Sequence, residues 1–222
     1  MTTSLMSLGI CLGASTVSIV RIEVMKGQSF DPDALGVKPK ITQTEMLAHD
    51  GNPQNALLAL LNKFDLSHID RIAATGRKFR EFVNLTSISE PQAVEIAYQY
   101  VKPESKTSPA IVSAGGETFM VYILNQLGQI TNVKTGNKCA SGTGEFFLQQ
   151  LRRMDVTLKE AAKWATEDEP YPVSGRCSVF CKSDCTHATN KGIPKSKVTA
   201  GLCRMMAAKI LELLKKIPLK NI

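Results

Sequence analysis

Residues 8–24 have the sequence Leu-Gly-Ile-Cys-Leu-Gly-Ala-Ser-Thr-Val-Ser-Ile-Val-Arg-Ile-Glu-Val, in which two β-branched, apolar runs flank Gly13-Ala14-Ser15. Such runs around small turn residues predict a β-hairpin with a narrow tip. A tip of Gly, Ser and Thr lets several backbone N–H groups point at one spot, which is how a loop holds phosphate oxygens without clashing side chains. Because Gly and Ser are also the usual turn residues, an ordinary hairpin is the alternative interpretation.

A second stretch, residues 110–124, repeats the pattern of apolar strand, small-residue turn and apolar strand, with Gly115-Gly116 at its turn. The segment 102–109 before it is polar and bounded by prolines, which predicts a joint between two subdomains. The sequence therefore predicts an α/β protein with a first lobe over residues 1–108 and a second over residues 109–222. Two such turns, one per lobe, could hold a polyphosphate between them.

The remaining chain alternates between strand and helix patterns. Strands are predicted at 40–47, 69–74 and 130–134, with a strand or loop at 84–89. Helices are predicted at 52–64, from Ser89-Glu90-Pro91 onward, and at 145–153, 158–166, 178–190 and 195–216. Trp164, Leu151, Leu158 and Ala162 are expected to be core positions of their helices.

Composition narrows the class of protein. With 222 residues, 43% hydrophobic and 21% charged, the chain suits an ordinary globular protein of one large or two small domains. The net charge of +7 suggests an anionic partner, but the basic residues are scattered without a nucleic-acid motif, which disfavours nucleic-acid binding. Binding of phosphate-rich small molecules fits the charge equally well. No apolar run approaches the length of a membrane span. Sparse cysteines and the lack of a signal peptide indicate reduced thiols and a cytoplasmic location.

Cys139 and Cys177 each stand at the start of a predicted helix, the first within Gly136-Asn-Lys-Cys-Ala-Ser-Gly-Thr-Gly144. Two thiolates cannot complete the four-cysteine ligand set of a common iron–sulfur cluster. If they bind one, the other two ligands come most simply from the same pair on a symmetry mate. The alternative is that both are buried structural cysteines.

Six short motifs follow one another along the chain in an order that resembles a known family. They are Gly9-Ile-Cys-Leu-Gly-Ala-Ser-Thr16, Ala74-Thr-Gly76, Ser89-Glu90, Val112-Ser-Ala-Gly-Gly-Glu-Thr118, Asn137-Lys-Cys-Ala-Ser-Gly-Thr-Gly144 and Ser174-Gly-Arg-Cys-Ser-Val-Phe180. Together they resemble the ATP-dependent activators of 2-hydroxyacyl-CoA dehydratases and the related ATPase subunits of benzoyl-CoA reductases, the BadF/BadG/BcrA/BcrD ATPase family. The resemblance covers essentially the whole chain.

The resemblance implies an actin, sugar-kinase and Hsp70-like fold, with two RNase-H-like lobes and ATP or ADP with Mg²⁺ in the cleft. It further implies a homodimer that holds one [4Fe-4S] cluster through Cys139 and Cys177 of each subunit. An electron from a donor such as ferredoxin or flavodoxin then passes to a 2-hydroxyacyl-CoA dehydratase or a related acyl-CoA reductase. The nucleotide would contact Gly13, Ala14, Ser15, Thr16, Gly115, Gly116, Gly142, Thr143 and Gly144.

Two positions depart from the family pattern. The activators usually carry aspartate at the positions of Cys11 and Ser113, just before the two turns, and such carboxylates hold hydrated Mg²⁺ and orient the attacking water. A thiol beside a triphosphate stays neutral and is a poor magnesium ligand. We therefore expect weakened nucleotide binding and slow or absent hydrolysis, with Glu90 and Glu117 as the remaining candidate catalytic carboxylates.

Three further cysteines and the carboxyl end leave alternatives open. Cys181 and Cys185 follow Cys177 at four-residue intervals, and either pack in the core or serve an altered or additional cluster; Cys203 lies in the next helix. The activators continue beyond this length, so the second lobe is expected to be truncated.

Three functional classes remain open: an ATP-driven electron-transfer activator, a degenerate non-hydrolysing iron–sulfur subunit, and a metal-free sugar-kinase-like binding protein.

Overall fold

The computed structural model describes residues 4–25, 38–76, 84–102, 108–136, 140–215 and 217. The predicted cluster ligand Cys139 lies outside these residues. The chain divides into two compact units, and each is described by itself. Unit 1 comprises Met1–Ser108 with Gln126–Ile130, and unit 2 comprises Pro109–Asn125 with Thr131–Ile222.

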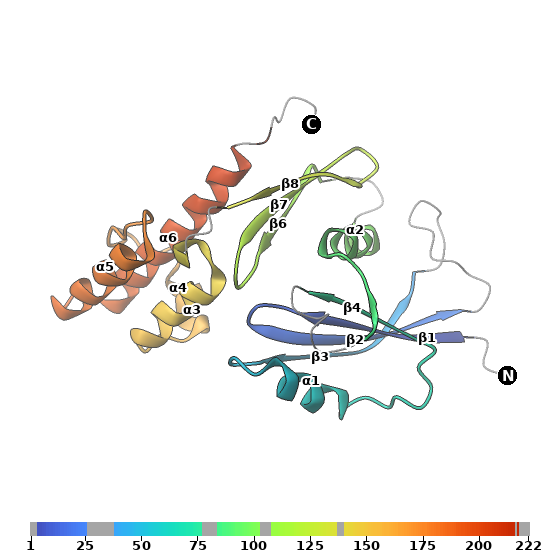
Figure 1. Ribbon diagram of the computed structural model, residues 1–222. Helices are drawn as coiled ribbons and strands as arrows, with labels where there is room; N and C mark the ends of the chain where they lie inside the picture. Colours follow the sequence, from blue (N-terminus) through green and yellow to red (C-terminus); the bar gives the residue numbers. More distant parts are fainter. Residues whose placement is uncertain are drawn as a thin grey trace. The chain divides into compact units, whose positions relative to one another are not determined.

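Unit 1 contains a five-stranded mixed sheet in the order β3-β2-β1-β4-β5 (Figure 1). The strands are β1 (Ser4–Leu12), β2 (Thr16–Met25), β3 (Lys40–Ala48), β4 (Arg71–Gly76) and β5 (Thr86–Ser87). The first three are antiparallel neighbours, whereas β4 runs parallel to β1 and β5 parallel to β4. The predicted first hairpin is confirmed, with Leu12 opposite Val17 at its tip.

Two helices complete unit 1 and lie on opposite sides of its sheet (Figure 1). Helix α1 (Pro53–Leu61) begins after Asn52, whose side chain accepts the Asn55 N–H, and α2 (Glu90–Val101) begins after Ser89, whose side chain accepts the Gln92 N–H. Both have proline in the first turn, where no N–H partner is needed. Alternate apolar residues of β1 and β2 point to one face and form the core with α1. They are Leu8, Ile10, Leu12, Val17 and Ile19, packed with Ala56, Leu57 and Leu60.

Unit 2 begins with a three-stranded sheet in the order β6-β7-β8. Its strands are β6 (Ala110–Ala114), β7 (Phe119–Leu124) and β8 (Ile130–Thr135), and β6 pairs antiparallel with β7. This confirms the predicted repeat of the strand–turn–strand device. A 3₁₀ turn, η2 (Ala140–Gly142), then leads into four helices: α3 (Gly144–Arg153), α4 (Leu158–Trp164), α5 (Ser178–Asn190) and α6 (Lys195–Leu214).

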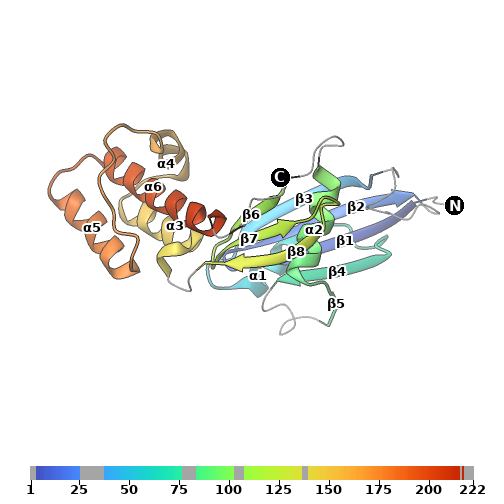
Figure 2. The ribbon, with the colours of Figure 1, turned by 90° about the horizontal axis from the view of Figure 1, so that it is seen from above.

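The four helices pack together beside this sheet (Figure 2). Helix α6 buries an apolar stripe at helical spacing, Val198, Leu202, Met205 and Leu213, because positions three or four apart share one face. Within the described part of the chain, no helix is both long and apolar enough to cross a membrane.

One expectation for α4 was wrong. Leu151 is buried as predicted and Trp164 is partly buried, but Leu158 is 61% exposed and Ala162 is also exposed. The inward face of this short helix is centred on Ala161, and Ala162 is rotated about 100° away from it. Leu158 is the first residue of the helix, at the edge of the packed face.

Candidate functional site

The turn between β1 and β2 is closed by its own backbone. The Gly13 N–H donates to the Thr16 carbonyl at 2.8 Å, and a Cβ on Gly13 would lie 3.1 Å from that same oxygen. That separation is tighter than most Cβ contacts, so a side chain here would force the turn open. The hairpin therefore ends in a narrow tip with little side-chain bulk, as the sequence predicts.

The turn between β6 and β7 has the same arrangement. A Cβ on Gly115 would lie 3.0 Å from the Thr118 carbonyl, which matches the approach between Gly13 and Thr16. Both hairpins thus carry a Gly-x-x-Thr turn in which the glycine packs against the carbonyl of the threonine. Each of the two units holds one such turn.

Two hydroxyl groups of unit 1 favour a polar ligand near the first turn. Among the described residues, Ser15 Oγ and Thr75 Oγ1 are buried and have no hydrogen-bond partner. Ser15 lies in the turn itself, and Thr75 pairs with Cys11 across β1 and β4. A buried hydroxyl without a partner is costly, and a phosphate oxygen is an acceptor that could satisfy such a group. The residues present therefore fit a phosphate group.

The end of β4 also comes close to this turn. Gly76 has a φ of +118°, and a Cβ there would lie 2.2 Å from the Leu12 carbonyl, so only glycine fits. The predicted Ala74-Thr75-Gly76 motif is thereby placed beside the last residues of β1, directly before the Gly13 turn.

Cys11 lies in unit 1 under the influence of a carboxylate. Although its side chain is exposed, desolvation by the surrounding atoms raises the pKa of the Cys11 thiol, and the Glu90 carboxylate raises it further, while a hydrogen bond with Ser18 lowers it. The net effect keeps the thiol neutral. Glu90, one of the two candidate catalytic carboxylates, thus acts electrostatically on the residue just before the first turn.

The second turn is hydrogen-bonded to the start of α3. The Gly144 N–H donates to the Gly115 carbonyl at 3.0 Å, and the Glu145 N–H donates to the Gly116 carbonyl at 2.9 Å. A Cβ on Gly144 would lie 3.0 Å from the Gly115 oxygen, so glycine permits this close approach. These amides therefore join α3 to the turn.

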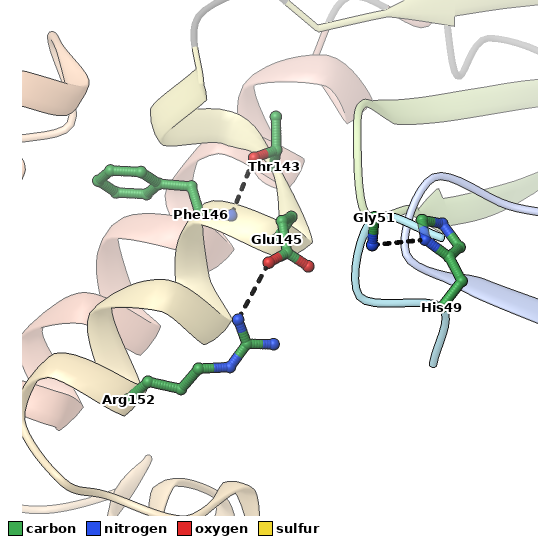
Figure 3. A network of polar contacts seen from close by, with 6 residues as sticks. All are labelled: His49, Gly51, Thr143, Glu145, Phe146 and Arg152. Atoms are coloured by element: carbon green, nitrogen blue, oxygen red, sulfur yellow. Dashed lines mark hydrogen bonds and ion pairs between the residues drawn. The ribbon is translucent and has the colours of Figure 1, made fainter. Parts of the chain in front are cut away.

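Side chains complete the first turn of α3 (Figure 3). Thr143 is the N-cap, and its Oγ1 accepts the Phe146 N–H at 3.2 Å. Glu145 forms an ion pair with Arg152 at 3.3 Å, one of several exposed pairs of modest strength. Figure 3 also draws His49 of unit 1, whose Nδ1 accepts the Gly51 N–H in the turn after β3. Thr143 and Gly144, two of the residues predicted to contact the nucleotide, thus form hydrogen bonds within unit 2.

Cys177 is the N-cap residue of α5. It is partly exposed, has an extended backbone with φ −149°, and makes no side-chain capping bond. The first N–H groups of α5 and the positive end of its dipole are therefore available to an anionic group at this position. A cluster thiolate fits these requirements. No group of three or more metal-binding side chains occurs among the described residues, from which Cys139 is missing.

The other described cysteines lie elsewhere in unit 2. Cys181 and Cys185 are 0% and 2% exposed within its hydrophobic core, which agrees with the packing interpretation. A hydrogen bond with Cys185 and burial raise the pKa of the Cys181 thiol, so Cys181 stays protonated, while the same hydrogen bond lowers the pKa of Cys185. Burial likewise raises the pKa of Cys203. His187 is exposed on α5.

Three polar contacts in unit 2 have no counterpart among the sequence-based predictions. They lie around the segment before Cys177: the Ser174 N–H donates to Asp184 Oδ2, and the Gly175 carbonyl accepts from Ser141 Oγ and Lys209 Nζ. The last two contacts join residues 34 positions apart, so no local pattern predicts them.

The two units have the fold of the 2-hydroxyacyl-CoA dehydratase activators, the actin, sugar-kinase and Hsp70-like fold that the sequence predicts. The activator of 2-hydroxyisocaproyl-CoA dehydratase from Clostridium difficile, solved with bound ADPNP, has a TM-score of 0.80 at 20% identity, covering 98% of this chain and 78% of that one. The BadF/BadG/BcrA/BcrD ATPase family matches residues 9–221, and the chain belongs to this family.

The curated relatives with functional names include an activating ATPase and a reductase subunit. The (R)-2-hydroxyglutaryl-CoA dehydratase activating ATPase of Acidaminococcus fermentans is 25% identical over 143 residues, 64% of this chain and 54% of that protein. A benzoyl-CoA reductase subunit of Thauera aromatica is 26% identical over 119 residues, 53% of this chain and 41% of that protein. The chain thus spans about half the length of these two relatives.

Proposed function

We propose that this protein is an ATP-binding activator that delivers a low-potential electron to a 2-hydroxyacyl-CoA dehydratase or a related acyl-CoA reductase. It works as a cytoplasmic homodimer, with residues 1–108 and 109–222 as its two lobes. One electron enters from reduced ferredoxin or flavodoxin and leaves to the partner enzyme. Family membership and the names of the relatives support this role.

One observation carries the proposal. The segment before Cys177 is hydrogen-bonded to Ser141, which lies two residues after Cys139 in the chain. The two cysteine motifs thus belong to neighbouring segments of unit 2. The same Ser141 lies in η2, directly before the helix that is bonded to the Gly115 turn. These hydrogen bonds support a connection between the proposed nucleotide turn and the described residues of the two cysteine motifs.

The cofactor is a [4Fe-4S] cluster, which supplies a one-electron carrier when bound. Cys139 and Cys177 of each subunit would hold it, because four thiolates complete its ligand set. The uncapped start of α5 would stabilise the negative charge at Cys177.

For the nucleotide, Gly13, Ala14, Ser15 and Thr16 hold one set of phosphate oxygens, and the Gly115-Gly116 turn holds another. Gly142, Thr143 and Gly144 contribute further contacts to the nucleotide, and the bond from the Gly144 N–H to the Gly115 carbonyl keeps this motif beside the second turn. Glu90 and Glu117 are the carboxylates left to bind Mg²⁺ or orient water.

A second candidate function rests on Cys11 and Ser113. Neither brings a carboxylate, and the neutral Cys11 thiol is a poor ligand for Mg²⁺. The alternative is a subunit of the same family that binds nucleotide and cluster without hydrolysing ATP. Steady-state ATPase measurements separate it from the activator.

The test of the cluster assignment is anaerobic purification followed by iron and sulfide analysis. We expect a brown protein, and Cys139→Ser or Cys177→Ser to reduce its iron to background. Cys181→Ser is the matched control, since it removes a thiol one helical turn away that is buried in the core. Equal iron in wild type and Cys177→Ser would refute the assignment.

A further inference from the structure

The carbonyl oxygen of Gly175 is held by side chains from two other elements of unit 2. It accepts a hydrogen bond from Lys209 Nζ of α6 at 2.7 Å and one from Ser141 Oγ of η2 at 3.4 Å. Ser141 is fully buried and Lys209 is partly buried. We call these three residues, Ser141, Gly175 and Lys209, the carbonyl junction.

The backbone around the carbonyl junction is closely fitted. A Cβ on Gly175 would lie 3.1 Å from Met205 Cγ and 3.7 Å from Lys209 Cε, so the segment rests directly on α6. One residue earlier, the Ser174 N–H donates to Asp184 Oδ2 of α5 at 2.8 Å. Two consecutive residues before Cys177 are therefore fixed by charged side chains from two helices.

The bond from Lys209 is the strongest single contact of the carbonyl junction. It is short and has a charged donor, and charge-assisted hydrogen bonds are roughly twice as strong as neutral ones. The Ser141 contact is longer and neutral. The Lys209 side chain also passes η2, since a Cβ on Gly142 would lie 3.5 Å from Lys209 Cδ. Lys209 thus contacts both segments that lead to the cysteine motifs.

The carbonyl junction is continuous with the second turn. Three residues after Ser141, the Gly144 N–H donates to the Gly115 carbonyl. At the other end, Lys209 belongs to α6, whose Leu213 lies within 3.8 Å of the Cβ position of Gly136 at the end of β8. The Gly115 turn and the end of β8 are thus both connected, through η2 and through α6, with the residues before Cys177.

We propose that Lys209 is a positioning residue, which holds the segments bearing Cys139 and Cys177 together and fixes Cys177 for cluster binding. This inference rests on the proposed function for the role of Cys177. The hydrogen-bonding role of Lys209 itself can be tested without iron.

The experiment compares Lys209→Met, Lys209→Arg and Arg204→Met with the wild-type protein. Lys209→Arg keeps a charged donor, and Arg204→Met removes a positive charge from an exposed position of the same helix. Hydrogen exchange of residues 174–178 is measured in the apoprotein, with the β1–β2 hairpin and α4 as internal references. Iron loss to a ferrous chelator is measured in the holoprotein, with and without ATP.

Lys209→Met should accelerate exchange in residues 174–178 and iron loss by about 10-fold, the effect of losing one charge-assisted bond. Lys209→Arg and Arg204→Met should remain within a few-fold of wild type. Unchanged exchange in Lys209→Met overturns the inference, and so does equal acceleration in α4, which would indicate a general loss of stability. If the wild type binds no iron, the proposed function fails, while the exchange comparison still decides the role of Lys209.

Discussion

Cys11 occupies a position where its chemistry conflicts with the expected reaction. Its thiol is kept neutral by desolvation and by Glu90, and it lies at the end of β1 beside the Gly13 turn. A neutral soft ligand does not replace a carboxylate as a magnesium ligand. This residue is therefore expected to slow ATP turnover.

Replacing Cys11 with aspartate should restore part of the magnesium site. We expect wild-type ATP turnover well below ~1 s⁻¹, the low end of typical enzymes, and an increase of at least ~10-fold in Cys11→Asp. A steady-state assay over a range of Mg²⁺ concentrations measures this. Cys11→Asn, which has the same shape without the charge, should stay at the wild-type rate. Similar rates in both variants would show that the missing carboxylate is not limiting.

The raised pKa of Cys11 predicts a pH dependence. When the alkylation rate of Cys11 is measured as a function of pH, its midpoint should lie above the ordinary thiol pKa of about 8.5. Because the folded protein holds this proton more tightly than the unfolded chain, the associated stability is present below the ordinary pKa and lost as pH rises through the folded pKa. Glu90→Gln should move the midpoint downward, measured by mass spectrometry of the labelled peptide.

The control for this titration is Glu23→Gln. Glu23 pairs with Met6, five positions along the hairpin from Cys11, and its removal should leave the midpoint unchanged. An equal shift in both variants would mean that overall charge, rather than Glu90, acts on the thiol.

At the scale of elements, local patterns predicted most of the fold. The β-branched runs of β1 and β2, the Ser89 cap of α2 and the apolar stripe of α6 each carry their signal within a few residues. The errors at Leu158 and Ala162 arose because a seven-residue helix is too short for its periodicity to fix its buried face.

Gly201 in α6 is a case where packing overrides helix preference. Gly201→Ala would normally stabilise a helix by up to ~1 kcal/mol. Here a Cβ would lie 1.8 Å from the Tyr171 carbonyl, so the backbone must shift. We expect a loss of about 1–3 kcal/mol in the free energy of unfolding, measured by urea denaturation.

The matched exchange is Ala207→Gly at an exposed position of the same helix, which should cost about 1 kcal/mol through helix preference alone. Both substitutions should therefore lower the free energy of unfolding, although one adds a methyl group to the helix and the other removes one. A more stable Gly201→Ala protein would contradict the close approach of the 170–173 segment to α6.

For the whole molecule, the sequence alone predicted the family and the paired turns, because these depend on ordered motifs along the chain. It did not predict the carbonyl junction, since Lys209 and Gly175 meet only after α6 has packed. Long-range contacts of single polar side chains leave no periodic signal. The turns of the candidate site were therefore predictable, and the residues that support them were not.

The proposed sharing of one cluster by two subunits predicts a defined stoichiometry. Light scattering should give twice the mass of one chain, and iron analysis about four iron atoms per two chains, as one [4Fe-4S] cluster requires. Four iron atoms per single chain would mean that each subunit completes its own ligand set. That result would return Cys181, Cys185 and Cys203 to consideration as ligands.

Burial of Cys181 and Cys185 has a consequence for handling the protein in air. Oxygen and peroxide attack thiols that they can reach, so sulfenic and sulfinic acids should accumulate at Cys11, Cys177 and Cys203, which are open to solvent to different degrees. The reaction should be slow at Cys11 and Cys203, because a raised pKa keeps these two thiols neutral. The two core thiols should survive intact until the unit unfolds. Peptide mapping of aged samples would show which cysteines have been oxidised. Oxidation confined to the exposed cysteines would indicate surface damage, and oxidation of Cys181 and Cys185 would indicate that the native packing of unit 2 had been lost.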